Sequence, residues 1–258
     1  MIEVKDLKKS FDDKAILKGI STSFEAGKTN LIIGTSGSGK TVFVKCLVGL
    51  LTPTSGSISY DGIEFTSLSQ REKKEIRTKI GMLFQGSALF DSMTVEENVM
   101  FPLNMFSKMT SKEKVERVNF CLERVNLVGA NKKYPAEISG GMMKRVGIAR
   151  AIVLNPKYLF CDEPNSGLDP KTALVIDELL SDITHEYNMT TIINTHDMNS
   201  VMGMGEKIVF LHQGYKEWEG NRHELLESDN ETLYDFIFAS EFLKELRKGA
   251  GKSIKLGK

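Results

Sequence analysis

The chain has 258 residues, 41% of them hydrophobic, enough for one large α/β domain with an attached lobe. Its 34 lysines and arginines balance 34 aspartates and glutamates, which argues against a protein that binds nucleic acid mainly by charge. No apolar run approaches the roughly 18 residues of a membrane-spanning helix, and residues 1–5 lack the core of a signal peptide. Cys46, Cys121 and Cys161 lie in apolar surroundings without metal-site spacing, which predicts reduced cysteines in a cytosolic protein.

The first third of the chain predicts strands around a glycine-rich loop. Residues 1–30 and 56–65, the latter with an Asp61-Gly62 turn, predict an antiparallel β lobe. Residues 30–33 form a short apolar run typical of a buried strand, and residues 42–51 predict an apolar helix.

The loop between that strand and that helix fits the pattern G-x-x-x-x-G-K-[ST] in the required strand–loop–helix context. Its residues are Gly34, Thr35, Ser36, Gly37, Ser38, Gly39, Lys40 and Thr41. Glycines let backbone N–H groups converge on a polyphosphate, and the helix start adds its positive dipole end. Lys40 would reach the β- and γ-phosphates, and the Thr41 hydroxyl would ligate Mg²⁺. The loop therefore predicts binding of a nucleoside triphosphate; the alternative is a plain glycine-rich turn.

Residues 93–155 predict a helical lobe, in which Thr110 and Glu113 have the spacing of a capping box. The lobe and the segment before it are rich in methionine and phenylalanine, which suits either an adaptable docking surface or an ordinary core. These residues are Phe84, Leu89, Phe90, Met93, Met100, Phe101, Met105, Phe106 and Met109.

A second anion-binding helix start is predicted at Ser139-Gly140-Gly141, where Ser139 is placed as an N-cap. A monomer has little use for two distant phosphate sites, whereas two copies arranged head to tail could each clamp the nucleotide of the other. By itself the triplet is more often a plain turn and cap.

Two acids follow the apolar run 158–161, which predicts a buried strand that ends in Asp162 and Glu163. Asp162 suits Mg²⁺, usually through water, and Glu163 suits polarisation of the attacking water. The alternative is a solvated turn at a strand end. Similarly, His196 follows the apolar strand 190–194 and, without the other motifs, would be a surface or capping residue.

The C-terminal part is predicted as a separate unit, residues 221–258, with a helix and a basic, glycine-rich tail over 244–258. The helix is indicated by Leu233, Phe236, Ile237, Phe242, Leu243 and Leu246. It could brace a dimer and the tail could touch anionic lipid, or the two could be a capping helix and a solvated tail. Residues 249–253 imitate a phosphate loop but lack its first glycine and its flanking strand and helix.

In combination, these motifs resemble the ATP-binding-cassette (ABC) ATPases over residues 1–220. The residues that carry the resemblance are Phe11, the loop 34–41, Gln85, Ser139 to Gly141, Asp162, Glu163, the run 166–169 and His196. The resemblance implies an α/β P-loop NTPase of ABC type. It has a mostly parallel core sheet with helices, an antiparallel β lobe and a helical lobe.

The resemblance also implies a role for each motif. Phe11 would stack on adenine, where the family more often has tyrosine. Gln85 would contact Mg²⁺, the attacking water and the transport partner, so that Thr41, Gln85 and Asp162 form the metal set. Ser139, Gly140 and Gly141 would contact the γ-phosphate across the dimer, with Asp169 in the loop that crosses it. Glu163, His196 and Gln85 are the expected catalytic residues.

One departure from the family pattern is Met142, where most cassettes have glutamine, which would complete a capping box with Ser139. The absence of this glutamine lowers the stability of the helix start by about 0.5–1 kcal/mol and leaves the phosphate contacts intact. The S-G-G-M form, together with the run 83–90 (LFQGSALF), resembles one subgroup: the ATPases of bacterial Mla-type (MCE-associated) lipid transporters.

The sequence therefore predicts an ATP- and Mg²⁺-dependent ATPase that powers a membrane transporter of phospholipid-type cargo. By resemblance it would be a head-to-tail homodimer on the cytoplasmic face of the inner membrane. Its partners would be integral permease subunits and, through the complex, MCE-type substrate-binding proteins, with no nucleic acid. The alternatives are a soluble ABC-type ATPase of repair, translation or cluster assembly, and a generic P-loop kinase or NTPase.

Overall fold

Two sheets organise the computed structural model, which describes residues 1–238. The larger sheet has the strand order β10-β9-β3-β8-β7-β6, and all its neighbouring pairs are parallel except β9 with β10. Its strands are β3 (Lys28–Ile33), β6 (Ile80–Leu83), β7 (Tyr158–Asp162), β8 (Thr190–Asn194), β9 (Lys207–His212) and β10 (Tyr215–Gly220). Parallel strands bring their carboxyl ends to one edge, where ligands of open α/β sheets bind.

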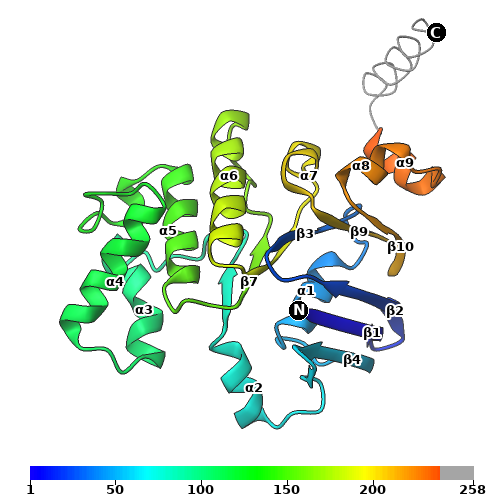
Figure 1. The fold of residues 1–258 in the computed structure, drawn as a ribbon, viewed down its shortest axis with the longest axis horizontal. Coiled ribbons are helices and arrows are strands. Elements are labelled where there is room, and N and C mark those ends of the chain that lie inside the picture. The colour runs from blue at the N-terminus through cyan, green and yellow to red at the C-terminus, as the bar shows by residue number, and fades with distance from the viewer. Residues whose placement is uncertain (239–258) are drawn as a thin grey trace, which may run out of the picture.

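The smaller sheet is antiparallel and has the order β2-β1-β4-β5. It contains β1 (Ile2–Phe11), β2 (Lys14–Phe24), β4 (Ser55–Tyr60) and β5 (Ile63–Glu64). This is the β lobe that the sequence predicts, and Figure 1 shows it beside α1 and β3. The turn residue Asp61 has φ +49° and Gly62 has φ +82°, as a tight hairpin turn requires.

The helices divide between the sheet and a separate lobe, drawn in green at the left of Figure 1. The lobe contains α3 (Val95–Phe106), α4 (Ser111–Arg124), the 3₁₀ turn η1 (Pro135–Glu137) and α5 (Gly140–Ile152). The others are α1 (Lys40–Leu47), α2 (Gln70–Arg77), α6 (Pro170–Glu186), α7 (Met198–Met204), α8 (Arg222–Glu227) and α9 (Glu231–Ile237). The predicted capping box of Thr110 and Glu113 opens α4. Helix α1 ends four residues before the predicted end.

Both faces of β3 are buried, which explains its continuous apolar run. Leu31 belongs to the core shared with α6 and the helical lobe, whereas Ile32 belongs to the core shared with α1 and the β lobe. The helical lobe joins the first core through α5, and a Cβ added at Gly147 would come within 2.6 Å of Leu83 in β6. Glycine therefore permits this close approach of helix and strand.

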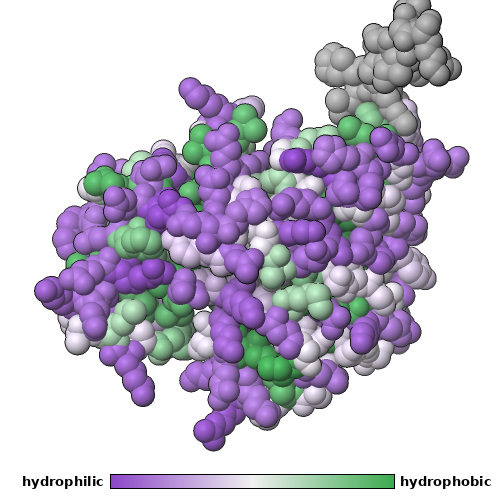
Figure 2. Space-filling model, in the orientation of Figure 1, coloured by the Kyte–Doolittle hydropathy of each residue, from purple (hydrophilic) through white to green (hydrophobic). Residues whose placement is uncertain are grey.

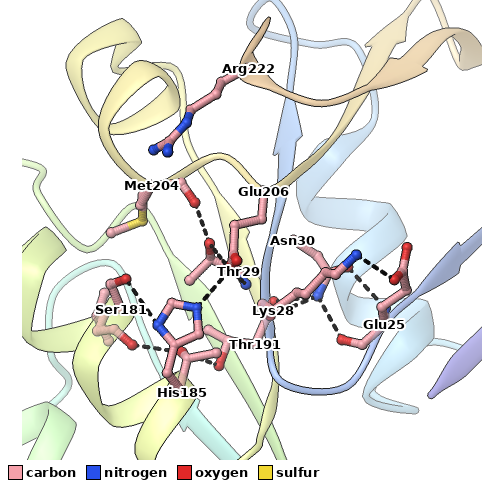
Figure 3. Close-up of polar contacts among 12 residues, drawn as sticks. Glu25, Lys28, Thr29, Asn30, Ser181, His185, Thr191, Met204, Glu206 and Arg222 are labelled. Atoms are coloured by element: carbon pink, nitrogen blue, oxygen red, sulfur yellow. Dashed lines mark hydrogen bonds and ion pairs between the residues drawn. The ribbon is translucent and has the colours of Figure 1, made fainter. Parts of the chain in front are cut away.

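At the amino end of β3, a polar cluster connects this strand with α6 and with the segment before β9 (Figure 3). The Glu206 carboxylate accepts hydrogen bonds from the Thr29 amide at 2.8 Å and the Thr29 hydroxyl at 3.0 Å. It also lies 3.0 Å from Nε2 of His185, in the last turn of α6. Burial raises the pKa of Glu206, but these hydrogen bonds and His185 outweigh burial and hold its pKa below the usual value.

The C-terminal elements pack on the main core through Leu233 and Ile237 of α9, and Phe236 lies 5.2 Å from Phe210 of β9. The predicted helix thus begins near Leu233, whereas Phe242, Leu243, Leu246 and the basic tail lie outside the described residues. The division of the chain at residue 220 stays a prediction. No helix among residues 1–238 is long and apolar enough to cross a membrane. In Figure 2 hydrophilic side chains cover most of the visible face, and hydrophobic ones gather in a few separate places.

Candidate active site

The glycine-rich loop leaves the carboxyl end of β3 and opens α1. Gly34 has φ +150°, and a Cβ there would meet the backbone oxygen of Leu211 at 2.2 Å. Gly39 is the N-cap of α1 with φ +102°, and a Cβ there would lie 2.9 Å from Leu17. Both positions therefore require glycine for two reasons: the backbone conformation disfavours a side chain, and neighbouring atoms leave no space for a Cβ.

Lys40 lies inside the curve of this loop and is only 8% exposed. Its Nζ donates to the backbone oxygens of Gly34 at 2.7 Å and Thr35 at 3.0 Å. Burial lowers the pKa of Lys40, while Glu163 and Asp162 oppose that shift. The ammonium group is thus held at the phosphate loop and faces the two acids that end β7.

Glu163 is the centre of a three-residue contact at the carboxyl ends of β6, β7 and β8. Its Oε2 accepts from Nε2 of Gln85 at 2.8 Å, and its Oε1 lies 3.0 Å from Nδ1 of His196. The Glu163 backbone has φ +47°, an uncommon conformation for a residue with a side chain. Its amide donates to the backbone oxygen of Asn194 at 2.8 Å, which holds that conformation in place.

One cavity of about 1210 Å³ unites these groups. Of the predicted residues, it is lined by Gly34, Thr35, Ser36, Gly37, Gly39, Lys40, Thr41, Glu163 and His196. Ser38, the remaining residue of the loop, is buried, with 3% of its surface exposed. Gln85 reaches the cavity wall through its hydrogen bond to Glu163.

The predicted metal set offers oxygen ligands of the kind that Mg²⁺ prefers. The Asp162 carboxylate is oriented by Nδ2 of Asn194 at 2.6 Å, and Gln85, which uses its nitrogen on Glu163, keeps a carbonyl oxygen for a cation. Within residues 1–238 no cluster of three or more His, Cys, Asp or Glu side chains could hold a metal alone. The oxygen atoms of Thr41, Asp162 and Gln85 suit a cation whose other ligands are phosphate and water.

The remaining predicted residues lie away from this cavity. Ser139 accepts from the Met142 amide at 3.3 Å and caps α5, without the reciprocal bond of a full capping box. Asp169 caps α6 through the amides of Lys171 and Thr172. The glycine pair lies beside this second cap, since a Cβ at Gly141 would come within 2.7 Å of Thr172, and Gly140 faces Leu168. Phe11 is 42% exposed and does not line the cavity; Lys9 lies 4.8 Å from its ring centre.

The cavity has a wall that the sequence motifs do not indicate. It is formed by Lys14, Ile16, His212, Glu231, Thr232, Asp235 and Phe236. Ile16 belongs to β2 and Asp235 to α9, which are separated by more than 200 residues in the chain and have no motif of their own. Ile16 lies beside Gly39 of the phosphate loop, and the packing of Phe236 on Phe210 brings α9 to the same cavity.

A family model described as "ABC transporter" matches residues 17–166, more than half of the chain. The chain belongs to the ABC transporter ATPase family. It is therefore an ATP-hydrolysing enzyme and an ATP-binding subunit of an ABC transporter, as the resemblance of the combined motifs implied. The prediction of an ABC-type P-loop fold is confirmed.

Curated ABC relatives match nearly the whole described chain. A probable ribonucleotide transport ATP-binding protein, mkl of Mycobacterium leprae, is 42% identical over 236 residues, which are 92% of this chain and 68% of that protein. The methionine import ATP-binding protein MetN of Campylobacter jejuni is 38% identical over 95% of this chain and 78% of its own length. The chain thus spans about two thirds to four fifths of these relatives.

Solved ABC structures match the fold. CbiO1 of Clostridium perfringens, described as part of the transporter complex cbiONQ, has a TM-score of 0.82 and 31% identity, over 89% of this chain and 91% of its own. An ATP-binding cassette solved as a dimer after hydrolysis, with ADP and Pi, has a TM-score of 0.78 and 33% identity, over 86% of this chain and 99% of its own.

Proposed function

We propose that the chain hydrolyses ATP with Mg²⁺ as a head-to-tail homodimer and thereby drives a lipid transporter from the cytoplasmic face of the inner membrane. The observation that carries the proposal is the contact of Glu163 with both Gln85 and His196 at the rim of the phosphate-loop cavity. It gives one carboxylate the two neighbours needed to orient a water molecule towards a γ-phosphate.

In the proposed mechanism the loop amides and Lys40 hold the β- and γ-phosphates, and Lys40 exchanges its contacts with Gly34 and Thr35 for phosphate oxygens. Mg²⁺, held by Thr41, Asp162 and Gln85, would neutralise phosphate charge. Glu163 takes or orients the proton of the attacking water, and His196 donates a hydrogen bond to the γ-phosphate.

The proposed dimer is based on predicted site residues that do not line the cavity of their own copy. Ser139, Gly140 and Gly141 lie at the start of α5, where the two glycines are next to Leu168 and Thr172 at the start of α6. Their free amides and the Ser139 hydroxyl suit an anion that another molecule presents. In a head-to-tail pair, Ser139 of one copy would complete the cavity around Lys40 of the other. The dimer-solved cassette among the structural neighbours supports this arrangement.

A permease is proposed to dock in a separate apolar groove of about 620 Å³ between α2, α3 and the Gln85 segment. Its lining includes the aromatic residues Phe84, Phe90, Phe101 and Phe106 and the basic residues Lys74, Arg77 and Arg150. Phe84 precedes Gln85, so a helix in this groove would act directly on the catalytic segment. Leu89 does not line the groove and packs partly buried against the core, so for this residue the core alternative holds and not the docking surface.

A phospholipid-type cargo, with MCE-type partners, is the finer part of the proposal and rests on the S-G-G-M form and the run 83–90. A second candidate is import of a small polar solute, which the names of the ribonucleotide and methionine relatives favour. Purification of the complex from membranes, followed by identification of bound lipids and by ATPase assays in vesicles, separates the two. Stimulation by phospholipid supports the first candidate; stimulation by methionine or ribonucleotide only would contradict it.

Docking is tested by Phe90→Glu, because a carboxylate in a desolvated groove would cost several kcal/mol. We expect the variant to lose membrane association while its ATP affinity stays within about twofold. The matched control is Phe120→Glu on α4, an equally exposed phenylalanine (both 41%) that is not part of the groove. Membrane association that survives Phe90→Glu would contradict the docking site.

A further inference from the structure

Lys144 is a buried cation in α5, the helix that Ser139 caps. It is 5% exposed, on the face of α5 that also buries Gly141, Ile148 and Ala151. A lysine on an apolar helix face is unfavourable unless its ammonium group is hydrogen-bonded. The motifs do not predict a role for it.

The Lys144 ammonium group contacts the backbone of two catalytic segments. Its Nζ donates to the backbone oxygen of Gln85, and it lies 3.4 Å from the backbone oxygen of Glu163. Burial lowers the pKa of Lys144, while Glu163, Cys161 and Asp162 oppose that shift. The geometry thus places one positive group between the ends of β6 and β7.

These contacts hold main-chain atoms and leave the side chains free. Gln85 and Glu163 contact each other through Nε2 and Oε2 at 2.8 Å. Because Lys144 fixes the backbone behind both residues, it sets the distance over which their side chains meet. Ser139 caps the same helix, so Lys144 links α5 to the backbone of both Gln85 and Glu163.

We propose that Lys144 is a positioning residue for ATP hydrolysis, which couples the helix of Ser139 to Gln85 and Glu163. This inference rests on the proposed catalytic role of Glu163. In the proposed dimer, α5 would have two roles. Ser139 would contact the nucleotide bound by the other copy, and Lys144 would position Gln85 and Glu163 in the cavity of its own copy. Lys144 would act on kcat and not on nucleotide affinity, since it does not line the cavity.

The test is steady-state ATP hydrolysis by the full chain with Lys144→Met, which keeps the length of the side chain but removes its donors and charge. Because displacement of catalytic groups by about 1 Å lowers rates strongly, we expect kcat to fall roughly 10- to 100-fold, with KM for ATP within about threefold. Lys144→Arg, which retains charge and donors, should recover at least part of that loss. Arg145→Met is the control, because Arg145 lies on the same helix but donates to the backbone of Asn126.

A kcat of Lys144→Met equal to that of Arg145→Met, or a loss confined to KM, would overturn the inference. If Lys144→Met does not fold, Lys144→Gln replaces it, since the shorter amide reaches at most one of the two carbonyls. A lowered kcat then supports the inference and an unchanged kcat overturns it. Glu163→Gln separates the two levels: if that variant hydrolyses ATP normally, the proposed function is wrong. If Glu163→Gln is inactive while Lys144→Met is normal, only the role of Lys144 is wrong.

Discussion

The replacement Glu163→Gln isolates the chemistry of the carboxylate from its geometry. Glutamine has the same shape, and its side-chain oxygen would still accept from Nε2 of Gln85 at the present 2.8 Å. Its nitrogen would face Nδ1 of His196, now 3.0 Å from the carboxylate. Lys40 and the loop 34–41 are not altered. We therefore expect the cavity to keep its form and to bind ATP with an affinity within about threefold of wild type.

Hydrolysis should fall steeply, because an amide cannot accept the proton of the attacking water. General-base catalysis contributes about 10²- to 10⁴-fold to a rate. This corresponds to a barrier about 2.7 to 5.5 kcal/mol higher. The loss should appear in kcat and leave the affinity unchanged, since the hydrogen bond from Gln85 persists and the new amide nitrogen can donate to His196 when its Nδ1 carries no proton.

The assay combines ATP affinity, measured with a fluorescent analogue, and phosphate release at saturating ATP and Mg²⁺. Glu178→Gln is the control, an exposed glutamate on α6. A Glu163→Gln variant with more than about a third of wild-type turnover would refute the reasoning. Equal losses of affinity and turnover would show that the side chain acts in binding and not in the chemical step.

Three further predictions follow from the same structure. Lys40→Ala should abolish nucleotide binding, because the phosphate loop loses the ammonium group that would compensate the charge of the β- and γ-phosphates; binding within tenfold of wild type would contradict this. Glu206→Gln should lower the free energy of unfolding by about 1–3 kcal/mol at pH 7, as its hydrogen bonds lose their charge. The pKa of Glu206 in the folded state lies below its usual value. The stabilisation is therefore present above about pH 4.5 and should be lost as the pH falls further. Urea unfolding of the variant and the wild type at pH 7 and pH 4 would measure this. Asp177→Leu should lower the free energy of unfolding by about 1–3 kcal/mol. The Asp177 carboxylate on α6 accepts from Nδ2 of Asn165 at 2.7 Å, and the same nitrogen donates to the Ser200 hydroxyl at 2.9 Å.

The sequence predicts those parts of the site that depend on local chain geometry. Strand β3, the glycine-rich loop and α1 are contiguous, so their pattern of apolar residues and glycines determines them together. Asp162 and Glu163 follow one buried strand and His196 another, and the common direction of parallel strands brings them to one edge. Their contact at Glu163 follows from that topology.

Other parts depend on packing between distant segments and have no local pattern. The α9 wall of the cavity depends on the contact of Phe236 with Phe210, and Lys144 is placed by the tight approach of α5 to β6 at Gly147. The choice between core and docking surface at Leu89 stayed open for the same reason, because the apolar residues of the segment 84–90 do not show which of them face the core. Phe90 is 41% exposed, whereas its neighbour Leu89 packs inward.

The central claim is a cavity that one copy builds and a second copy completes, and a mixture of two inactive variants tests it most directly. Lys40→Ala removes the phosphate-loop cation, and Ser139→Arg blocks the helix start that would face the other copy's nucleotide. In a mixed dimer one of the two cavities keeps both Lys40 and Ser139. The account predicts that ATP hydrolysis, absent from each variant alone, returns when the two are mixed with Mg²⁺ and ATP. No recovery, with both variants folded and mixed dimers demonstrated by crosslinking, would contradict it.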